Sequence, residues 1–432
     1  MNKARIRSLI AACAVLCGLV VPATAGAASL YVSNSAPTVT GGKSCTQPNF
    51  NTVQGAIDAL KSIANGTVNV CPGTYAEQLT ITHPVKLTVA GTAGSAKVTL
   101  PASPVNNDTP CDKAAAEAGF TPDQDEISIC GNGKISITGL KVEAHWPSGT
   151  CATSMYGIRV AGGATLQATN VTVDGAGATP INGCQTGVGI QAGTTRTTPA
   201  ESAGLKLKGV TVSGYQKNGI TIAAKGSTAS IATTTVTGAG ATPEIAQNGI
   251  QVSAGAQAKI KTSKISGNEC NHSSCGPEGF SQSQSTGLLF LGAAPGSSVT
   301  SSTSSGNDIG AYYLSESASQ PASPELLLSK DAFTANRYEG VLLDQGDASL
   351  KSDTITGPGN IGIELQQYEG QTLSSQSSAS STKIEGMSEA GVRVASDKAP
   401  SDIAGKFTLT KSTFASDATV LNNESNNFEV IF

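Results

Sequence analysis

Short runs of alternating apolar and polar residues recur along most of the chain. The window LKLKGVTVSG at 205–214 has apolar residues at positions 1, 3, 6 and 8, and mainly polar residues between them. Alternation with a period of two predicts a strand with one buried face. The phase shifts by one residue at position 5, and such a shift exchanges the two faces of a strand. Each window is therefore predicted to be two short strands that meet at a corner.

This pattern repeats in the same order along the chain, and a third strand of the type Gly-apolar-x-apolar follows most copies. The windows lie at 135–144, 166–175, 205–214, 229–238, 258–267, 297–306, 326–335 and 348–357, with weaker copies at 377–386 and 407–416. The third strands lie at 157–160, 189–192, 219–222, 249–252, 287–290, 310–313, 340–343, 362–365 and 391–394. Three short strands per repeat predict a three-sided solenoid. An antiparallel sandwich is the alternative, but it gives no reason for one three-strand phrase to recur in order.

A short amphipathic helix is expected before the first repeats. Phe50, Val53, Ala56, Ile57 and Leu60 fall on one helical face. Such a helix can cover the open end of the solenoid, where unpaired strand edges would promote aggregation.

The repeats and the stretch FNTVQGAIDALKSIANGTVNVCPGTYAEQLTITHPVKLTVAG (50–91) resemble the pectin lyase-like superfamily. This resemblance implies an all-β fold, a single-stranded right-handed parallel β-helix with a short N-terminal capping helix. The expected organisation is a signal peptide at 1–28 and a β-helix domain at 29–432. Within the domain we expect an N-terminal cap at about 45–75, coils at about 76–420 and a C-terminal cap at 421–432. The superfamily hosts many functions, so the resemblance specifies fold and not activity.

The first 28 residues are typical of a secretory signal peptide. Lys3, Arg5 and Arg7 precede an apolar segment at 9–21, and small residues follow at 23–28. The apolar segment is shorter than the ~20 residues that a membrane span needs. We expect a secreted extracellular protein without a membrane span, with the periplasm or the cell surface as alternative locations.

Without the three basic residues of the leader, 24 basic and 31 acidic residues remain, a net charge of −7. Nucleic-acid-binding proteins usually have the opposite sign. We therefore expect no nucleic-acid partner, and we expect a monomer.

Eight cysteines remain after the leader, and an even number in an exported protein predicts disulfides. Cys151 and Cys184 precede the glycines of successive third strands by six and five residues. They should lie at the same corner of adjacent coils, about 4.8 Å apart, within disulfide reach. The predicted pairs are Cys45–Cys71, Cys111–Cys130, Cys151–Cys184 and Cys270–Cys275. The sequence has no C-x-x-C pair and its three histidines are scattered, so no metal site is predicted.

In this superfamily ligands usually lie along one sheet that is flanked by long loops. Here the longest insertions, at 145–156, 176–188, 239–248 and 268–286, all precede a third strand. They should stack into one wall beside the outward side of the third strands. The outward residues there form a column of Arg159, Gln191, Thr221, Gln251, Leu289, Tyr312, Leu342, Glu364 and Arg393.

The column and its neighbours supply the candidate site residues. The candidate catalytic residues are Arg159, His145, Asp344, Glu364 and Arg393. The candidate ligand-binding residues are Trp146, Gln191, Gln251 and Tyr312. Asp344, Glu364 and Arg393 follow one another near the C-terminal end, either as a small polar site or as a surface charge ladder. Trp146 could stack on a sugar ring or pack against Tyr156 or the Cys151 loop.

Two further stretches are interpreted as loops. Asp123, Asp125 and Glu126 are predicted to lie in an acidic surface loop, with calcium binding as the alternative. The serine-rich stretch at 371–382 is predicted to be a flexible loop. No cofactor other than calcium is suggested by the sequence.

The residues in the middle of the outward column are uncharged. For this reason a non-catalytic function is placed before an enzymatic one. A uronate lyase needs a general base beside a neutralised carboxylate. Arg159 and Arg393 are about eight coils apart, roughly 38 Å, which is too far to share one sugar. The aspartate cluster of polygalacturonases and the DPHD-type motif of alginate epimerases do not occur in the sequence. We expect a glycan-binding, surface or matrix protein. The alternative is a polysaccharide lyase or glycoside hydrolase acting on an extracellular polysaccharide, with uronate-containing polymers as one option.

Overall fold

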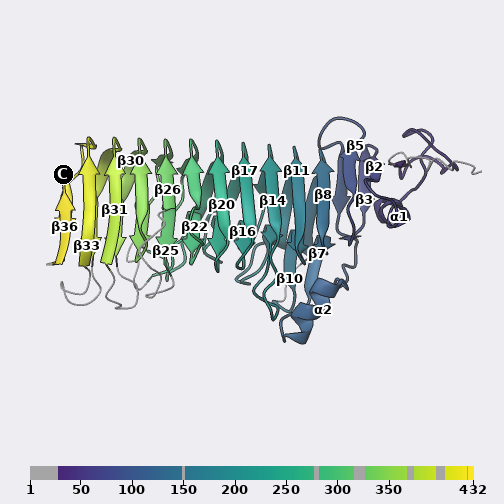
Figure 1. Ribbon diagram of the computed structural model, residues 1–432, viewed down its shortest axis with the longest axis horizontal. Coiled ribbons are helices and arrows are strands. Elements are labelled where there is room, and N and C mark those ends of the chain that lie inside the picture. The colour runs from purple at the N-terminus through teal and green to yellow at the C-terminus, as the bar shows by residue number, and fades with distance from the viewer. Residues whose placement is uncertain are drawn as a thin grey trace, which may run out of the picture.

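The chain forms a long stack of short parallel strands with an α-helix near one end (Figure 1). The computed structural model describes residues 28–147, 151–276, 282–315, 326–366, 374–395, 404–425 and 427–432. The signal peptide predicted at 1–28 lies outside the described residues except for Ala28. The predicted all-β, right-handed parallel β-helix is confirmed, and it consists of one 14-stranded sheet and two further strand ladders.

The 14-stranded sheet, called the first sheet here, contains the first strand of each repeat. Its strands are β1 (Ser29–Val32), β2 (Thr67–Val70), β5 (Lys86–Val89), β8 (Gly133–Thr138), β11 (Ala164–Thr169), β14 (Gly204–Lys208), β17 (Thr228–Ala232), β20 (Gln257–Lys261), β23 (Ser298–Thr300), β26 (Leu326–Ser329), β29 (Ala348–Lys351), β31 (Ser374–Ser380), β33 (Ala404–Thr410) and β36 (Asn427–Ile431). They pair in parallel in this order.

The second and third strands of the repeats form two more parallel ladders. The second ladder contains β3 (Gly73–Ala76), β6 (Ala96–Thr99), β9 (Lys141–Pro147), β12 (Thr172–Thr179), β15 (Thr211–Ser213), β18 (Thr235–Thr242), β21 (Lys264–Cys270), β24 (Thr303–Ser305), β27 (Ala332–Thr334), the first parts of β30 (Thr354–Gln366) and β32 (Lys383–Ala395), and β34 (Thr413–Ala415). The third ladder contains β4 (Leu79–Ile81), β7 (Asp123–Cys130), β10 (Ser154–Ala161), β13 (Val188–Ala192), β16 (Asn218–Ala223), β19 (Asn248–Ser253), β22 (Thr286–Leu291), β25 (Ile309–Leu314), β28 (Glu339–Asp344), the later parts of β30 and β32, and β35 (Leu421–Asn423).

The inward side chains of the three ladders fill the interior of the stack. Leu205, Leu207, Val210 and Val212 are each at most 2% exposed, as the alternation in their window predicts. Equivalent residues of all coils form one continuous apolar cluster. Each coil therefore buries its apolar side against its neighbours, as expected for a solenoid.

A left-handed residue makes the corner between the first and second strands of each window. These residues occupy window position 5, with φ between 51° and 74°: Gly139, Asn170, Gly209, Thr233, Thr262, Ser301, Lys330, Ser352, Ser381 and Lys411. The predicted corner is thus confirmed. Only glycine, and to some extent asparagine, adopts this conformation without a steric cost.

Window position 6 carries a ladder of buried polar side chains in the later coils, although small or apolar residues were expected there. The backbone N–H of Ser263 donates to Ser302 Oγ at 3.1 Å. The N–H of Ser302 donates to Asp331 Oδ1, and that of Asp331 to Asp353 Oδ1, both at 2.7 Å. Each side chain thus satisfies a buried donor of the adjacent coil.

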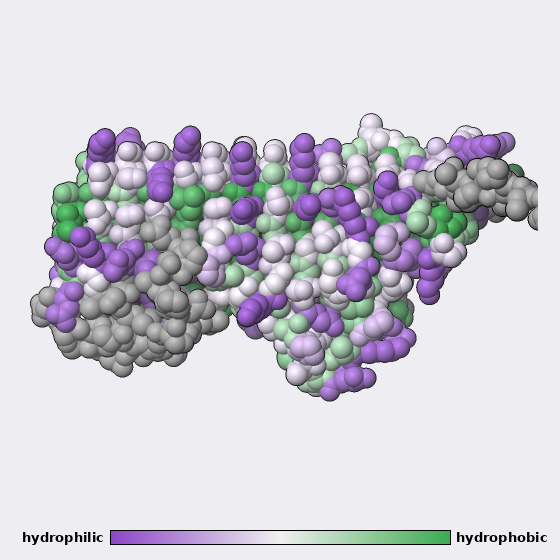
Figure 2. Space-filling model, viewed as in Figure 1, coloured by the Kyte–Doolittle hydropathy of each residue, from purple (hydrophilic) through white to green (hydrophobic). Residues whose placement is uncertain are grey.

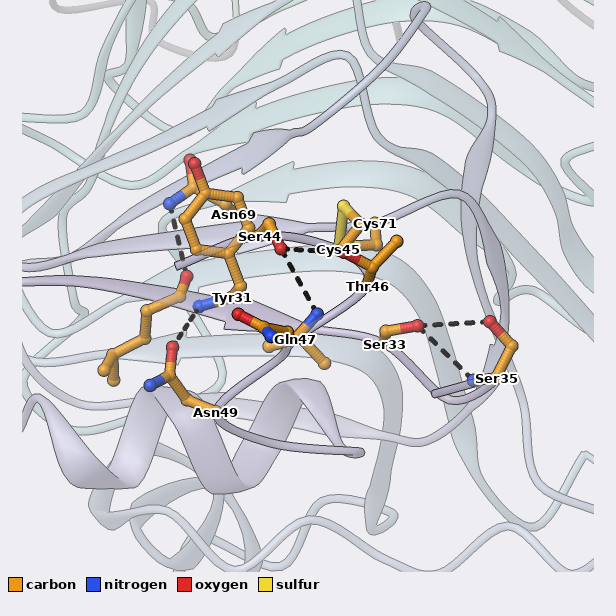
Figure 3. The surroundings of a disulfide bond; sticks show 12 residues. Tyr31, Ser33, Ser35, Ser44, Cys45, Thr46, Gln47, Asn49, Asn69 and Cys71 are labelled. Atoms are coloured by element: carbon orange, nitrogen blue, oxygen red, sulfur yellow. Dashed lines mark hydrogen bonds between the residues drawn. A yellow bond between two sulfur atoms is a disulfide. The ribbon is translucent and has the colours of Figure 1, made fainter. Parts of the chain in front are cut away.

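The N-terminal end is closed by the expected helix and by a disulfide. Helix α1 (Val53–Ala59) begins after Thr52, whose side chain accepts a hydrogen bond from the N–H of Gly55. Cys45–Cys71 joins the preceding loop to the first coil (Figure 3). All four predicted disulfides are confirmed: Cys45–Cys71, Cys111–Cys130, Cys151–Cys184 and Cys270–Cys275.

A second helix, α2 (Pro110–Glu117), projects from the stack on the side of the third ladder (Figure 1) and was not predicted. A capping box starts it, because Thr109 Oγ1 accepts from the N–H of Asp112 and the Asp112 carboxylate accepts from the N–H of Thr109. Cys111–Cys130 ties the helix to the end of β7.

Both stretches interpreted as loops contain strands instead. Asp123, Asp125 and Glu126 lie in β7, and all three are at most 3% exposed. Within the serine-rich stretch, 374–380 form β31, which pairs with β29 and β33. These interpretations were wrong because pairing with neighbouring coils overrides local composition in a solenoid.

Candidate functional site

The outward column of the third ladder exists in the predicted order. The parallel register joins the neighbours Arg159–Gln191–Thr221–Gln251–Leu289–Tyr312–Leu342–Glu364–Arg393, one residue per coil. We call the outward side of the third ladder the third face.

The outward position of Thr221 in the column predicts that its side chain is exposed. That prediction was wrong, because the third face is largely closed to solvent. Thr221 is 5% exposed and Gln191 is 8% exposed. Their polar atoms bond within the face: Asn218 Nδ2 donates to Thr221 Oγ1 and to Gln251 Oε1, both at 3.0 Å. Gln191 Nε2 donates to the carbonyl of Gly193 at 2.6 Å. The middle of the face is therefore a neutral, internally bonded array.

A buried ion-pair cluster lies at the N-terminal end of the third face. Arg159 is 2% exposed, and its Nη1 pairs with Asp112 and, at 3.0 Å, with Asp123 Oδ2. Arg196 also pairs with Asp123, and its Nη1 donates to the hydroxyl of Tyr156 at 3.1 Å. Burial alone would lower the pKa of Arg159, but the surrounding aspartates raise it. Arg159 thus remains charged and joins α2 to the stack.

Two carboxyl groups of β7 accept no hydrogen bond within the described residues. They belong to Asp125 and Glu126, which are fully buried on β7. Burial raises the pKa of Asp125 well above its usual range and that of Glu126 to about 9. Glu126 should therefore be protonated at neutral pH. Among the described residues no group of His, Cys, Asp and Glu side chains is arranged to hold a metal ion.

His145 and Trp146 lie on β9 in the second ladder and do not join the Arg159 cluster. His145 is exposed, and its ring lies against Gly175. Trp146 is 4% exposed and packs with Ala144 and Met155. A buried indole does not offer its face to a sugar, so this structure does not support stacking by Trp146. Arg159 thus lies beside acidic residues of β7, whereas His145 lies on a strand of the second ladder.

A second polar cluster lies at the C-terminal end of the third face. Asp344 is fully buried and accepts hydrogen bonds from Tyr312 Oη and Gln366 Nε2, both at 3.1 Å. Tyr312 itself is half-buried. The three residues come from adjacent coils, as the register of Asp344 with Leu314 and Gln366 shows.

Coupled carboxylates complete this C-terminal cluster. Burial raises the pKa of Glu364 to about 7, and Arg393 opposes this shift. Burial and the neighbouring Glu364 raise the pKa of Glu339 well above its usual range. Arg393 pairs with Glu424 at 3.2 Å and with Glu389 at 3.4 Å. The prediction that Asp344, Glu364 and Arg393 lie together is confirmed by the register, whereas a simple surface ladder does not describe two nearly inaccessible carboxyl groups.

The wall of insertions beside the third face holds an open pocket of about 260 Å³. Its lining includes Gln185, Lys217, Glu244, His272 and Ser274. Lys217 Nζ donates to the carbonyl of Ala246 at 2.8 Å, and burial lowers the pKa of this lysine. Glu244 and His272 are exposed. The stacking of successive insertions into one wall, which the sequence predicts, is what forms this pocket.

Some residues of these clusters were missed from the sequence. The capping-box pattern at Thr109–Asp112 could have revealed α2, but not that Asp112 meets Arg159. Glu339 stands one residue before the glycine of its third strand, where Asn218 and Asn248 stand in earlier coils. The residues before these glycines form a second column, and the sequence could have identified them as further candidates for a site.

Comparison with known proteins agrees with this architecture. A family model described as a right handed beta helix region matches residues 189–375. The chain is a right-handed parallel β-helix protein, and the resemblance to the pectin lyase-like superfamily is confirmed at the level of fold.

Solved structures with similar folds include enzymes and a tailspike protein. The A-module of the Azotobacter vinelandii mannuronan C-5 epimerase AlgE6 is 13% identical, with a TM-score of 0.56 over 88% of this chain and 92% of that one. The catalytic domain of a GH87 alpha-1,3-glucanase in complex with tetrasaccharides is 11% identical, with a TM-score of 0.57 over 92% and 68%. The Dettilon tailspike protein is 13% identical, with a TM-score of 0.53 over 93% and 68%. No curated protein matches the chain by sequence. At these identities the likeness concerns the fold alone.

Proposed function

We propose that this protein binds an extracellular polysaccharide without cleaving it. The observation that carries this proposal is the state of the third face, where β-helix enzymes would be expected to keep their chemistry. At its N-terminal end the charged side chains are buried in ion pairs, at its C-terminal end the carboxyl groups of Asp344 and Glu364 are nearly inaccessible, and its middle is a neutral array of amides and hydroxyls. General acid–base catalysis needs titratable groups that can reach the substrate.

The wall pocket is the proposed place for a sugar unit. Gln185, Glu244, His272 and Ser274 offer an amide, a carboxylate, an imidazole and a hydroxyl around one concave site. Such groups pair readily with sugar hydroxyls, which both donate and accept hydrogen bonds. A few polar groups in a concave site are typical of small-ligand recognition.

The wider context supports an extracellular role. Four disulfides are typical of proteins that fold in an oxidising compartment. Among the described residues no helix is long and apolar enough to cross a membrane. Structurally similar proteins bear names that refer to mannuronan and glucan, which supports a polysaccharide as the ligand class by analogy of fold only.

The proposal is tested by binding of the mature chain to a panel of polysaccharides immobilised on a biosensor. At least one polysaccharide should bind, and Glu244→Ala with His272→Ala should weaken that binding by about tenfold, as loss of hydrogen bonds to a ligand does. Glu117→Ala with His145→Ala is the control, because these residues are also exposed but lie outside the pocket. Equal binding by both double variants would exclude the pocket, and no binding across the panel would exclude the function.

An enzyme remains the second candidate because of one observation, the pKa of about 7 at Glu364. A carboxylic acid with that pKa suits general acid catalysis in a glycoside hydrolase. The test is the release of reducing ends, or of unsaturated products absorbing near 235 nm, from uronate and neutral polysaccharides with calcium added. Activity that is lost in Glu364→Gln and kept in Glu385→Gln would establish this candidate. No product from any polysaccharide would exclude it.

A further inference from the structure

We propose that the outward side of the first sheet, called the first face here, binds a linear anionic polysaccharide. This surface is separate from the third face and from the wall pocket, so the proposal goes beyond the function above. The first face carries eight exposed lysines on its strands: Lys86, Lys134, Lys206, Lys208, Lys259, Lys261, Lys351 and Lys406.

Seven of these lysines have no acidic neighbour on their own sheet, whereas Lys406 has Glu429 of β36 as its register partner. From β2 to β33 the described strands of the first sheet contain no Asp or Glu, and Glu429 on the terminal strand β36 is the first. None of the eight lysines makes an ion pair within the described part of the chain. In Figure 2 hydrophilic groups line the upper rim of this face, where the strands of the first sheet end. Because the mature chain carries seven more acidic than basic residues, composition alone would not produce an all-positive face.

The second ladder of the same molecule shows the usual arrangement for comparison. Lys141 pairs with Glu143, and Lys97 pairs with the same carboxylate at 3.3 Å. Lys383 pairs with Glu385 at 2.8 Å. Outward lysines of the second ladder therefore mostly have a carboxylate beside them, whereas seven of the eight lysines of the first face have none on their own sheet. Unpaired like charges repel one another, so this segregation needs a reason other than stability.

The densest part of the first face has a regular geometry. Lys206 and Lys208 lie two residues apart on β14, about 6.7 Å along the strand. Ser230 is the register partner of both Lys206 and Lys259, so these two lysines are separated by one strand, about 9.6 Å. Lys208 and Lys261 are related in the same way through Ala232. The four lysines thus form a patch of roughly 10 by 7 Å around two small residues.

Neutral hydrogen-bonding side chains continue this patch along the stack. Gln167 and Thr169 flank it on β11, and Ser298 and Thr300 flank it on β23. A chain of sugars lying along the axis of the solenoid would meet ammonium groups on β14 and β20 and hydroxyl or amide groups on the flanking strands β11 and β23. Carboxylate, sulfate or phosphodiester groups on the polysaccharide would complement the lysines, whose compact charges do not need the planar geometry that arginine demands.

The test measures binding of the mature chain to polygalacturonate, alginate, dextran sulfate and a phosphodiester-linked wall polymer, with dextran as the neutral control. At about 50 mM salt the anionic polymers should bind and dextran should not bind to this face, and binding should weaken steeply as salt rises because exposed charges are screened. Comparison of the anionic polymers shows whether carboxylate, sulfate or phosphodiester groups are recognised.

The decisive comparison uses two quadruple variants with the same change in net charge. The four substitutions Lys206→Ser, Lys208→Ser, Lys259→Ser and Lys261→Ser should weaken binding to the anionic polymers by about tenfold or more, because several exposed ion pairs are lost together. The control replaces Lys97, Lys141, Lys264 and Lys383 of the second ladder by serine and should change binding by about twofold or less. Thermal unfolding of both variants verifies that the solenoid is intact.

Several outcomes would overturn the proposal. Equal losses in the two quadruple variants would show a response to net charge rather than to this face. Unchanged binding in the first-face variant would place the polymer elsewhere. Tighter binding of single-stranded DNA or of anionic vesicles than of any polysaccharide would assign the face to another class of partner. Loss of binding in the Glu244→Ala, His272→Ala variant, with the lysine variant unaffected, would support the wall pocket and overturn the first face.

Discussion

Arg159 Nη1 and Asp123 Oδ2 form a 3.0 Å ion pair in which neither side chain is more than 2% exposed. The pair joins β10 to the adjacent β7, and Asp112 on α2 meets the same guanidinium. A buried guanidinium among several carboxylates is stable only as a complete set, since removing one member leaves charges in a low dielectric. The ion pairs of the Arg159 cluster therefore attach helix α2 to the solenoid.

Arg159→Met should destabilise the protein by about 3–5 kcal/mol, because it leaves Asp112 and Asp123 without their buried counter-charge. Arg393→Met is the matched control, since Arg393 occupies the same column but is half-buried and pairs with partly exposed glutamates. It should cost less than about 1 kcal/mol. Chemical denaturation at pH 7 measures both values.

The loss caused by Arg159→Met should shrink near pH 4, because protonation of the stranded carboxyl groups removes their charge. A loss that is the same at pH 4 and pH 7 would show that the arginine acts through packing of its aliphatic stem and not through its charge.

The sequence pattern predicted the order of residues in the outward column but not their accessibility. Period-two alternation tells which side of a strand a residue takes, so Arg159, Thr221 and Arg393 were placed correctly. Whether other segments cover that side depends on insertions that have no repeat. The burial of Thr221 and Gln191 could therefore not be predicted from the alternation.

Local composition failed in two places for the same physical reason. Ser374–Ser380 has no apolar alternation, and Asp123–Glu126 is acidic, yet both stretches are strands. In a solenoid the neighbouring coil supplies the backbone partners and the register, so a segment with weak propensity still forms a strand. The cysteine pairs were predictable because the repeat itself sets the distance between equivalent corners, as with Cys151 and Cys184.

The left-handed corners predict a stabilising substitution. Thr233 has φ of 51° at an exposed position, where a β-branched residue is strained. Thr233→Asn should stabilise the protein by about 0.5–1 kcal/mol, since Asn170 already occupies the equivalent corner and asparagine tolerates this conformation. The control is Thr211→Asn on β15, an exposed strand position where the same change should be neutral or destabilising. Thermal unfolding compares the two, and a lower midpoint for Thr233→Asn would contradict the corner argument.

The two disulfides of the insertion wall should contribute unequally. Cys151–Cys184 closes a loop with a sequence separation of 33, whereas Cys270–Cys275 has a separation of 5. By the loop-entropy relation, replacing both cysteines by serine should cost about 4 kcal/mol for the first pair and about 2 kcal/mol for the second. Denaturation under non-reducing conditions shows which pair contributes more to stability. A larger loss for Cys270–Cys275 would mean that native contacts of the short loop outweigh chain entropy.

The polar ladder at window position 6 predicts an unusual dependence of stability on pH. Burial raises the pKa of Asp331 to about 6 and that of Asp353 to about 7, against an ordinary value of 3.8. Between about pH 4 and pH 7 the folded state therefore binds more protons than the unfolded state. The stabilisation from these protons is fully present below pH 4 and is lost as pH rises through 6 and 7.

Asp331→Ser with Asp353→Ser should flatten this dependence, because serines in the same column already accept the ladder hydrogen bond, as Ser302 does from Ser263. The native protein should lose stability from pH 4 to pH 8, by roughly 3 kcal/mol for Asp331 and roughly 4 kcal/mol for Asp353, and the double variant should lose less. Asp174→Ser, at a half-buried position of the second ladder, should leave the slope unchanged. The measurement is the denaturation midpoint at closely spaced pH values. A native profile that is flat or rises from pH 4 to pH 7 would show that the backbone donors of Ser302 and Ser329 stabilise the ionised carboxylates more than burial penalises them.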